Sequence, residues 1–299
     1  MKRRIFNQIT GSAVLASHPF VQWMRKLAAS PSFEMELLRG NVGYFTERGG
    51  TIGWMLGNEG IVVVDAQFPA QAEHLIEEIR KESQSPIEYL INTHHHGDHT
   101  AGNVAFKGIA KRILAHENSK KNQENAARAR GNLDSQLLPD MTFADKWTKR
   151  VSGETITMEY WGRGHTDGDA LTHFENANVV HLGDLVFNRR YPYIDKGAGA
   201  SIENWINILD RVKRHYDDET IFITGHARDG YPIVIDKDDI SAFAHYLGKV
   251  LEFVGGEIKR GKSDEEILKA TAIPGAPEWK GEGIQRSLNA AITELREGK

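Results

Sequence analysis

The 299-residue chain contains no cysteine. This absence excludes disulfide bonds, a cysteine nucleophile and thiolate ligands for a metal ion. It leaves the redox compartment open, because a protein without thiols folds in either environment. Any catalytic group or metal ligand must therefore come from other side chains, among which are 13 histidines.

The chain also lacks a long apolar run and an excess of basic charge. No apolar segment approaches the roughly 20 residues that a membrane-spanning helix needs. The 37 lysines and arginines are outnumbered by 41 acidic residues, which gives a formal net charge of -4. Because nucleic acids and anionic membranes favour basic surfaces, we expect a small-molecule substrate, no nucleic acid and no membrane span. The oligomeric state stays open.

The first 30 residues support two interpretations. A basic run at residues 2–4 includes Arg3-Arg4 and precedes a modestly apolar stretch at 9–16, and small residues at 28–30 offer a cleavage site. This arrangement resembles a bacterial twin-arginine export signal and would predict a periplasmic or secreted protein. The alternative is an amphipathic helix with its apolar face over residues 20–27, on a protein that stays in the cytoplasm.

Short strands and helices alternate along the rest of the chain. The clearest predicted elements are strands at 61–64, 87–92 and 221–223, helices at 68–83, 117–130 and 201–216, and a mostly helical region from Lys237 onward. One α/β domain over residues 31–299, with many strands per helix, fits this pattern better than a regular βαβ array. Residues 131–142 are predicted to be a loop, and the segment 117–142 could form a lid over a site.

The strongest local signal is the histidine-rich segment at residues 93–99, which follows a predicted strand and reads THHHGDH. Side chains two apart in an extended segment point the same way, so His94 and His96 can bind one metal ion together. The glycine then lets the backbone turn, and Asp98 and His99 can face a second ion. Imidazole and carboxylate ligands suit zinc, and also iron or manganese.

Three downstream motifs offer further ligands at turns or strand ends. Each places a histidine or an aspartate directly after a glycine, as Gly164-His165, Gly183-Asp184 and Gly225-His226. Any one of them alone would more often be structural. Their combination with the histidine-rich segment predicts a metal site assembled from several strand ends.

These motifs, together with Asp65 after a buried strand, resemble those of the metallo-β-lactamase superfamily in kind and order. The resemblance covers roughly residues 33–230. It implies an α/β fold, a four-layer αββα sandwich with the metal site at one edge of the sheets, followed by a helical C-terminal part. It also implies two zinc ions per chain, with iron or manganese as alternatives. Carried over by motif, the ligands would be His94, His96 and His165 on the first ion, Asp98, His99 and His226 on the second, and Asp184 on both. Asp65 would support the ligands from behind.

The resemblance further implies a metal-dependent hydrolase. A hydroxide shared by the two ions would attack an ester, thioester, lactone or amide bond, including that of a β-lactam, and Asp98 would orient it and manage its proton. The lack of cysteine excludes those β-lactamases that place a cysteine on the second ion. Asp184 instead resembles the bridging aspartate of glyoxalase-II-like and lactonase-like hydrolases. Two alternatives remain, a mononuclear iron dioxygenase of sulfur compounds from the same superfamily and a non-catalytic metal-binding protein.

Other residues have weaker claims on the site. Tyr191 and Tyr193 follow the Asp184 motif, where a tyrosine hydroxyl could bond a substrate oxygen. Arg163 and Lys196 could pair with a substrate carboxylate, although a solvated surface is the simpler interpretation. Four further histidines are expected to be exposed, packed or hydrogen-bonded rather than ligands, namely His95, His116, His173 and His181.

Overall fold

The computed structural model describes residues 33–298. The predicted export signal or N-terminal helix over residues 1–30 lies outside this range. Within the described residues, no helix is long and apolar enough to span a membrane.

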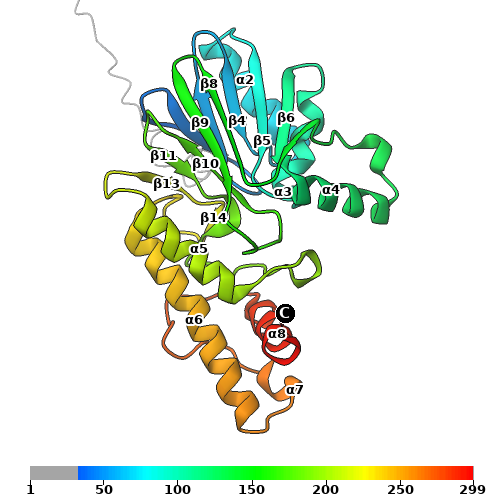
Figure 1. The fold of residues 1–299 in the computed structure, drawn as a ribbon, viewed down its shortest axis with the longest axis vertical. Helices are drawn as coiled ribbons and strands as arrows, with labels where there is room; N and C mark the ends of the chain where they lie inside the picture. The colour runs from blue at the N-terminus through cyan, green and yellow to red at the C-terminus, as the bar shows by residue number, and fades with distance from the viewer. Residues whose placement is uncertain (1–32, 299) are drawn as a thin grey trace, which may run out of the picture. The chain divides into compact units, whose positions relative to one another are not determined.

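Two β-sheets form the centre of the described fold (Figure 1). The seven-stranded sheet follows chain order, with β1 (Glu34–Arg39), β2 (Val42–Thr46), β3 (Ile52–Leu56), β4 (Ile61–Val64), β5 (Ile87–Asn92), β6 (Ala110–His116) and β7 (Met141–Phe143). The six-stranded sheet has the order β15 (Val234–Ile235), β13 (Ile221–Ile223), β11 (Val179–His181), β10 (Ala170–Phe174), β9 (Glu154–Tyr160) and β8 (Lys146–Val151). A parallel pair, β12 (Phe187–Asn188) and β14 (His226–Ala227), forms a small third sheet.

The two large sheets pack face to face through one apolar core. The seven-stranded sheet contributes Val62 and Val64 of β4, while Met158 and Val179 come from the six-stranded sheet. All four residues of β4 are buried, and alternation points Ile61 and Val63 toward the opposite face. A strand that is covered on both faces explains the continuous β-branched sequence of this segment.

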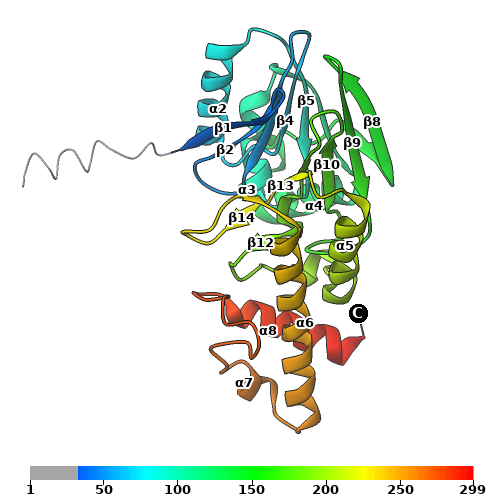
Figure 2. The same ribbon diagram turned by 90° about the vertical axis from the view of Figure 1, so that its left-hand side faces the viewer.

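Helices cover the outer faces of both sheets (Figure 2). On the seven-stranded sheet lie α2 (Pro69–Glu82) and α4 (Glu117–Arg130), whereas α5 (Ile202–His215) packs on the six-stranded sheet and α6 (Lys237–Lys259) packs against α5 and β12. The amphipathic α5 buries Trp205 and Leu209 in a core that also contains Val180 of β11 and Phe222 of β13. The predicted four-layer αββα sandwich is therefore confirmed.

Two further helices follow α6, and the second of them is held against the body of the fold. These are α7 (Asp264–Ile267) and α8 (Ile284–Glu297). The Tyr246 hydroxyl of α6 donates to Ser287 of α8 at 2.9 Å. The buried Glu294 carboxylate of α8 accepts the backbone N–H groups of Ile202 and Glu203, at 2.8 and 2.9 Å, and so caps the start of α5. These contacts fix where the first turn of α8 lies.

The short connecting elements include one error of the sequence interpretation. They are α3 (Gly97–Thr100), η1 (Ala101–Phe106), η2 (Leu133–Ser135), η3 (Gly183–Leu185) and η4 (Lys196–Ala198). Residues 131–142 were predicted to be a loop, yet Met141 begins β7, which pairs in parallel with β6. A strand of only three residues carries too little periodicity to be recognised in the sequence.

Candidate metal centre

The histidine-rich segment turns sharply where β5 ends. His96 has an extended conformation (φ -65°, ψ 146°) and serves as the N-cap of α3, so the helix begins at Gly97. Asp98 and His99 therefore lie in the first helical turn, while His94 remains on the extended part. The change from extended chain to helix at His96 explains how four candidate ligands between His94 and His99 can face two different positions.

The first group of converging side chains consists of His94, His96, His165 and Asp184, whose ligand atoms all lie within 4.8 Å of one another. His165 Nε2 is 2.8 Å from His96 Nδ1 and 3.4 Å from Asp184 Oδ2. His94 Nε2 is 3.7 Å from the same oxygen. Three imidazole nitrogens and one carboxylate oxygen thus surround a common point.

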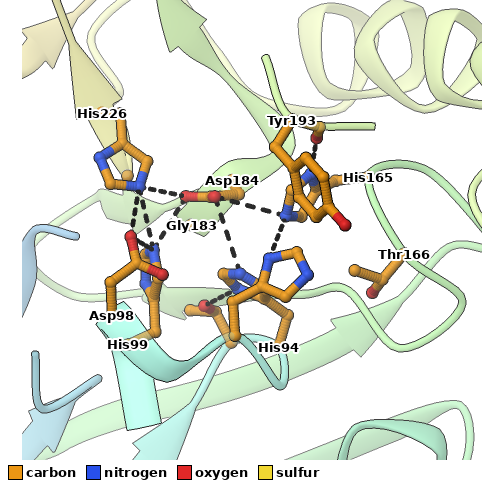
Figure 3. A network of polar contacts seen from close by, with 12 residues as sticks. His94, Asp98, His99, His165, Thr166, Gly183, Asp184, Tyr193 and His226 are labelled. Carbon is orange, nitrogen blue, oxygen red and sulfur yellow. Dashed lines mark hydrogen bonds and ion pairs between the residues drawn. The ribbon is translucent and has the colours of Figure 1, made fainter. Parts of the chain in front are cut away.

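The second group consists of Asp98, His99 and His226. His226 Nε2 is 3.1 Å from Asp98 Oδ2 and 3.3 Å from His99 Nε2. The other oxygen of Asp184, Oδ1, is 3.0 Å from His99 Nε2 and 3.5 Å from His226 Nε2. Asp184 therefore lies between the two groups and presents one oxygen to each, as Figure 3 shows.

The position of Asp184 depends on glycines beside it. Gly183 has a left-handed backbone (φ 53°), which L side chains rarely adopt. A Cβ atom on Gly225 would overlap Asp184 Oδ1 and the backbone of Gly183. The glycines that precede the aspartate and His226 in the sequence thus allow two strand ends to approach each other closely.

The unsatisfied polar atoms of the site fit bound divalent cations. His94 Nε2 is buried and has no hydrogen-bond partner among the described residues, and the buried Asp184 Oδ1 has no hydrogen bond of normal geometry there, although His99 Nε2 lies 3.0 Å away. Burying such atoms without a partner is costly, and a cation would satisfy both. The imidazole nitrogens that approach each other in the two groups need a cation or a shared proton between them. A set of nitrogen and oxygen donors without thiolate suits zinc, iron or manganese.

The electrostatics favour the metal-binding forms of most of these groups. Burial lowers the pKa of His94 and His165, to about 3 for His165, so both rings are neutral. Burial alone would raise the pKa of Asp98, but its contacts with His226 and His99 outweigh that effect and lower it. The pKa of His99 is raised, because the carboxylates of Asp184 and Asp65 outweigh the opposing effect of burial. A divalent cation beside this ring would favour its neutral form.

Asp65 lies behind the site rather than in it. Its carboxylate accepts the backbone N–H and the hydroxyl of Thr93, at 2.8 and 2.7 Å, and the Nδ1–H of His99 at 2.7 Å. The last bond fixes the tautomer of His99 and directs its Nε2 toward Asp184. The motif resemblance implied such a supporting role for Asp65, and that role stays a prediction.

Two more histidines are oriented by acceptors that the sequence interpretation did not identify. His165 Nδ1 donates to the backbone carbonyl of Tyr193 at 2.6 Å. His96 Nε2 donates to Asp195 Oδ2 at 2.9 Å. Asp195 is also the N-cap of η4 and accepts the N–H of Ala198. The sequence gives no indication of the contact with His96, because the two residues lie 99 positions apart.

A cavity of about 500 Å³ opens onto the site and contains both predicted tyrosines in its wall. Tyr193 is 44% exposed, and its ring centroid lies 5.3 Å from that of His96. Tyr191 is 7% exposed, and its hydroxyl donates to the carbonyl of Trp279 at 2.8 Å. The hydroxyl of Tyr191 is thus already bonded within the protein, whereas Tyr193 is the tyrosine that a substrate can reach.

Other sequence predictions are placed away from this cavity. Lys196 pairs with Glu294 at 3.0 Å, and Arg163 does not line the cavity. The segment 117–142, predicted as a lid, contributes none of the lining residues. The wall contains instead Arg190, Glu282, Gly283 and Arg286, none of which was identified from the sequence.

The remaining histidines behave as supporting residues. His95 is largely buried, with its Nε2 3.6 Å from Asp195 Oδ2. His116 stacks on Tyr160 and accepts the N–H of Asn118 at the start of α4. His173 packs edge-on against Tyr216. His181 bridges the carbonyl of Thr51 and the N–H of Gly183, at 3.1 Å each, and so holds the turn that carries Asp184.

Comparison with known proteins identifies relatives of several activities. The chain is 26% identical over 179 residues to the metallo-β-lactamase IND-1 of Chryseobacterium indologenes, an alignment that covers 58% of this chain and 70% of the relative. It is 28% identical over 160 residues to the 2,4-dinitroanisole O-demethylase subunit alpha of a Nocardioides species, covering 52% of this chain and 47% of that one. Among solved structures, the sec-alkyl sulfatase PisA1 superposes with a TM-score of 0.69 at 13% identity, over 88% of this chain and 50% of the sulfatase.

The family itself is identified by a match that spans more than half of the chain. The sequence profile described as "Metallo-beta-lactamase superfamily" matches residues 45–226, a range that contains every candidate ligand from His94 to His226. The helices from α6 onward follow the matched range. The resemblance inferred from the motifs is confirmed, and the chain belongs to the metallo-β-lactamase superfamily.

Proposed function

We propose that the protein is a dinuclear metal-dependent hydrolase of a small molecule, acting on an ester, thioester, lactone or amide bond, with β-lactams among the candidates. The single observation that carries the proposal is the placement of Asp184, whose two oxygens face two separate groups of donors. The proposed ligands of one ion are His94, His96 and His165, those of the other are Asp98, His99 and His226, and Asp184 is shared. We propose zinc as the metal, with iron or manganese as alternatives.

Two divalent ions in such a site supply Lewis-acid chemistry, since they lower the pKa of a water molecule and polarise the oxygen of the substrate. The protein's own residues determine how that chemistry is directed. Asp98 is 34% exposed and lines the cavity, so its carboxylate is accessible from the side where a substrate enters. Because its pKa is lowered, it is ionised at neutral pH and can accept a hydrogen bond or a proton.

The surrounding hydrogen bonds keep the ligands in place during turnover. Asp65 holds His99, the Tyr193 carbonyl holds His165, and Asp195 holds His96. Such contacts preorganise a site, because the ligand rings need not reorient when substrate binds.

The two alternative functions receive less support. A mononuclear iron dioxygenase needs one ligand group, whereas Asp184 presents its two oxygens to two groups in this chain. A non-catalytic metal-binding protein has no need of a 500 Å³ cavity that leads to the site.

A substrate panel tests the proposal. The names of the relatives widen the choice of bonds, so the panel should contain a β-lactam, a lactone, a thioester, an aryl ester, an aryl methyl ether and an alkyl sulfate. We expect hydrolysis of at least one compound, its loss on chelation and its recovery with added zinc. Oxygen uptake by an iron-loaded protein, without any metal-dependent hydrolysis, would favour the dioxygenase instead.

We also propose that the protein is exported to the periplasm or secreted, on the basis of Arg3-Arg4 and the small residues at 28–30. Fractionation of cells that express the full chain tests this. An uncleaved product that stays in the cytoplasm when twin-arginine transport is intact would contradict it.

A further inference from the structure

Two arginines stand in the wall of the cavity that contains the candidate metal centre. Arg190 follows the short strand β12, and Arg286 lies in the first turn of α8. Both line the cavity together with Asp98, Asp184 and His226. Arg190 and Arg286, almost 100 positions apart in the sequence, therefore place two guanidinium groups in the wall of the same cavity.

Arg190 differs from its neighbour Arg189 in having no partner. Arg189 is locked, because its guanidinium pairs with Asp239 at 2.8 Å and with Glu278 at 2.9 Å. Within residues 33–298, Arg190 forms no ion pair and donates no side-chain hydrogen bond. Arg189 thus anchors the segment to α6 and to the loop before α8, while the exposed side chain of Arg190 lines the cavity.

Arg286 is likewise without a carboxylate partner in the described part of the chain. Its guanidinium lies over the ring of Tyr193, with 5.9 Å between the guanidinium carbon and the ring centroid. Its backbone position is set by the bonds that join α8 to α5 and α6 through Glu294 and Ser287. The side chain is therefore held at the cavity by a fixed helix.

The charges of the lining are not balanced by the protein. Among the described lining residues, Glu282 is the one carboxylate outside the candidate ligand set, and it forms no ion pair with either arginine. Two cations that face a shared space repel each other, and the repulsion is relieved when an anion enters between them. Guanidinium groups are well suited to this role, because their N–H groups match the paired oxygens of an oxyanion.

We propose that Arg190 and Arg286 bind an oxyanion group of the substrate, a carboxylate or a sulfo group, while the bond to be cleaved lies beside Asp98 and Asp184. This inference rests on the proposed hydrolytic function and adds the substrate class, an anionic organic molecule. Phe187 and the exposed ring of Tyr193 provide an apolar wall for the body of that molecule. One of the two anion-binding residues comes from α8, which lies beyond residues 45–226, so substrate choice depends on the C-terminal helices.

Binding of a matched pair of non-hydrolysable probes tests the inference without requiring turnover. The matched pair is hexane-1-sulfonate and its neutral counterpart hexyl methyl sulfone. A third probe, heptanoate, tests whether a carboxylate binds in place of the sulfo group. Isothermal titration calorimetry of the metal-loaded full chain is compared among wild type, Arg190→Gln, Arg286→Gln, the double variant and Arg286→Lys. The control is Arg150→Gln, which removes the same charge from an exposed position on β8 that does not line the cavity.

We expect wild type to bind at least one anionic probe about tenfold or more tightly than the sulfone, as charge-assisted bonds to two guanidinium groups predict. The double variant should lose that preference, Arg286→Lys should keep part of it, and Arg150→Gln should bind like wild type. Metal content and circular dichroism establish that the variants are folded and loaded, so a loss cannot come from the metals.

Equal binding of the anionic probes and the sulfone, unchanged binding in the double variant, or no binding of either anion at about 10 mM would overturn the inference. The proposed hydrolytic function fails in a different way. In that case no compound of the substrate panel is turned over, although the arginine-dependent preference for the anions persists.

Discussion

Asp195 Oδ2 lies 2.9 Å from His96 Nε2, on the side of the imidazole opposite to the nitrogen that faces His165. One ring therefore connects a carboxylate behind the site to the candidate metal position. Because the bond holds the proton on Nε2, it leaves Nδ1 free to bind a cation.

Replacing Asp195 with alanine should weaken metal binding at the first group. The loss of a carboxylate that orients a ligand histidine typically lowers metal affinity by about 10- to 100-fold. Competition with a chromophoric chelator measures this affinity. Asp195→Asn is the matched variant and should lose less, since its amide oxygen can still accept from His96. Wild-type affinity in Asp195→Ala would show that the contact does not orient the ligand.

Asp98→Asn should reduce kcat by roughly a hundredfold or more, with a smaller change in KM. The substitution keeps the shape and one oxygen but removes the charge, so both the second metal position and the proton acceptor are weakened. Excess zinc should restore metal occupancy and only part of the rate. Complete recovery of the rate with zinc would mean that Asp98 serves only as a ligand.

His116 should make stability depend on pH away from the metal centre. Its Nδ1 accepts the N–H of Asn118 at the start of α4, and burial lowers the pKa of the ring. The neutral ring is therefore favoured in the folded state. Its contribution to stability is present above the unfolded pKa of about 6.5 and is lost as the pH falls through the lowered folded value.

The matched variant His116→Asn keeps an N-cap acceptor but does not titrate. Urea denaturation between pH 7 and pH 5 should show wild type losing stability relative to this variant, by about 1 kcal/mol, the usual contribution of a cap. A constant difference between the two proteins across this range would contradict the assignment.

Tyr191 and Tyr193 should respond differently to loss of the hydroxyl. Tyr191→Phe leaves the carbonyl of Trp279 without its donor, so the free energy of unfolding should fall by about 1 kcal/mol. Tyr193→Phe removes an exposed hydroxyl and should leave stability almost unchanged, with its effect confined to KM. Equilibrium unfolding and steady-state kinetics of both variants distinguish the roles. If Tyr193→Phe lost stability and Tyr191→Phe did not, the structural role would belong to Tyr193, and this assignment would be wrong.

Much of the fold was predictable because its elements are contiguous patterns. The strand at 61–64 and the helices at 68–83 and 201–216 correspond to β4 (Ile61–Val64), α2 (Pro69–Glu82) and α5 (Ile202–His215). Each carries its own apolar periodicity or β-branched run, and the residues that this pattern predicts to be buried are buried in the sandwich. The three-residue β7 carries no such pattern and was missed.

The set of candidate ligands was predicted from local motifs, since five of them lie beside a glycine, and His94 and His99 belong to the same histidine-rich segment. The contacts that orient and surround them were not. Asp195 reaches His96 across 99 positions, and Arg286 reaches the cavity only because Glu294 and Ser287 dock α8. Such contacts depend on tertiary packing and leave no local mark in the sequence.

The most direct test of the central claim is the metal content of Asp184→Ala compared with wild type, both purified without chelators and analysed by inductively coupled plasma mass spectrometry. A carboxylate shared by two ligand groups predicts about two equivalents of metal in wild type. It predicts about one or fewer in Asp184→Ala, with circular dichroism unchanged and hydrolysis abolished. One equivalent in wild type, or two equivalents and full activity in Asp184→Ala, would contradict a dinuclear centre joined by Asp184.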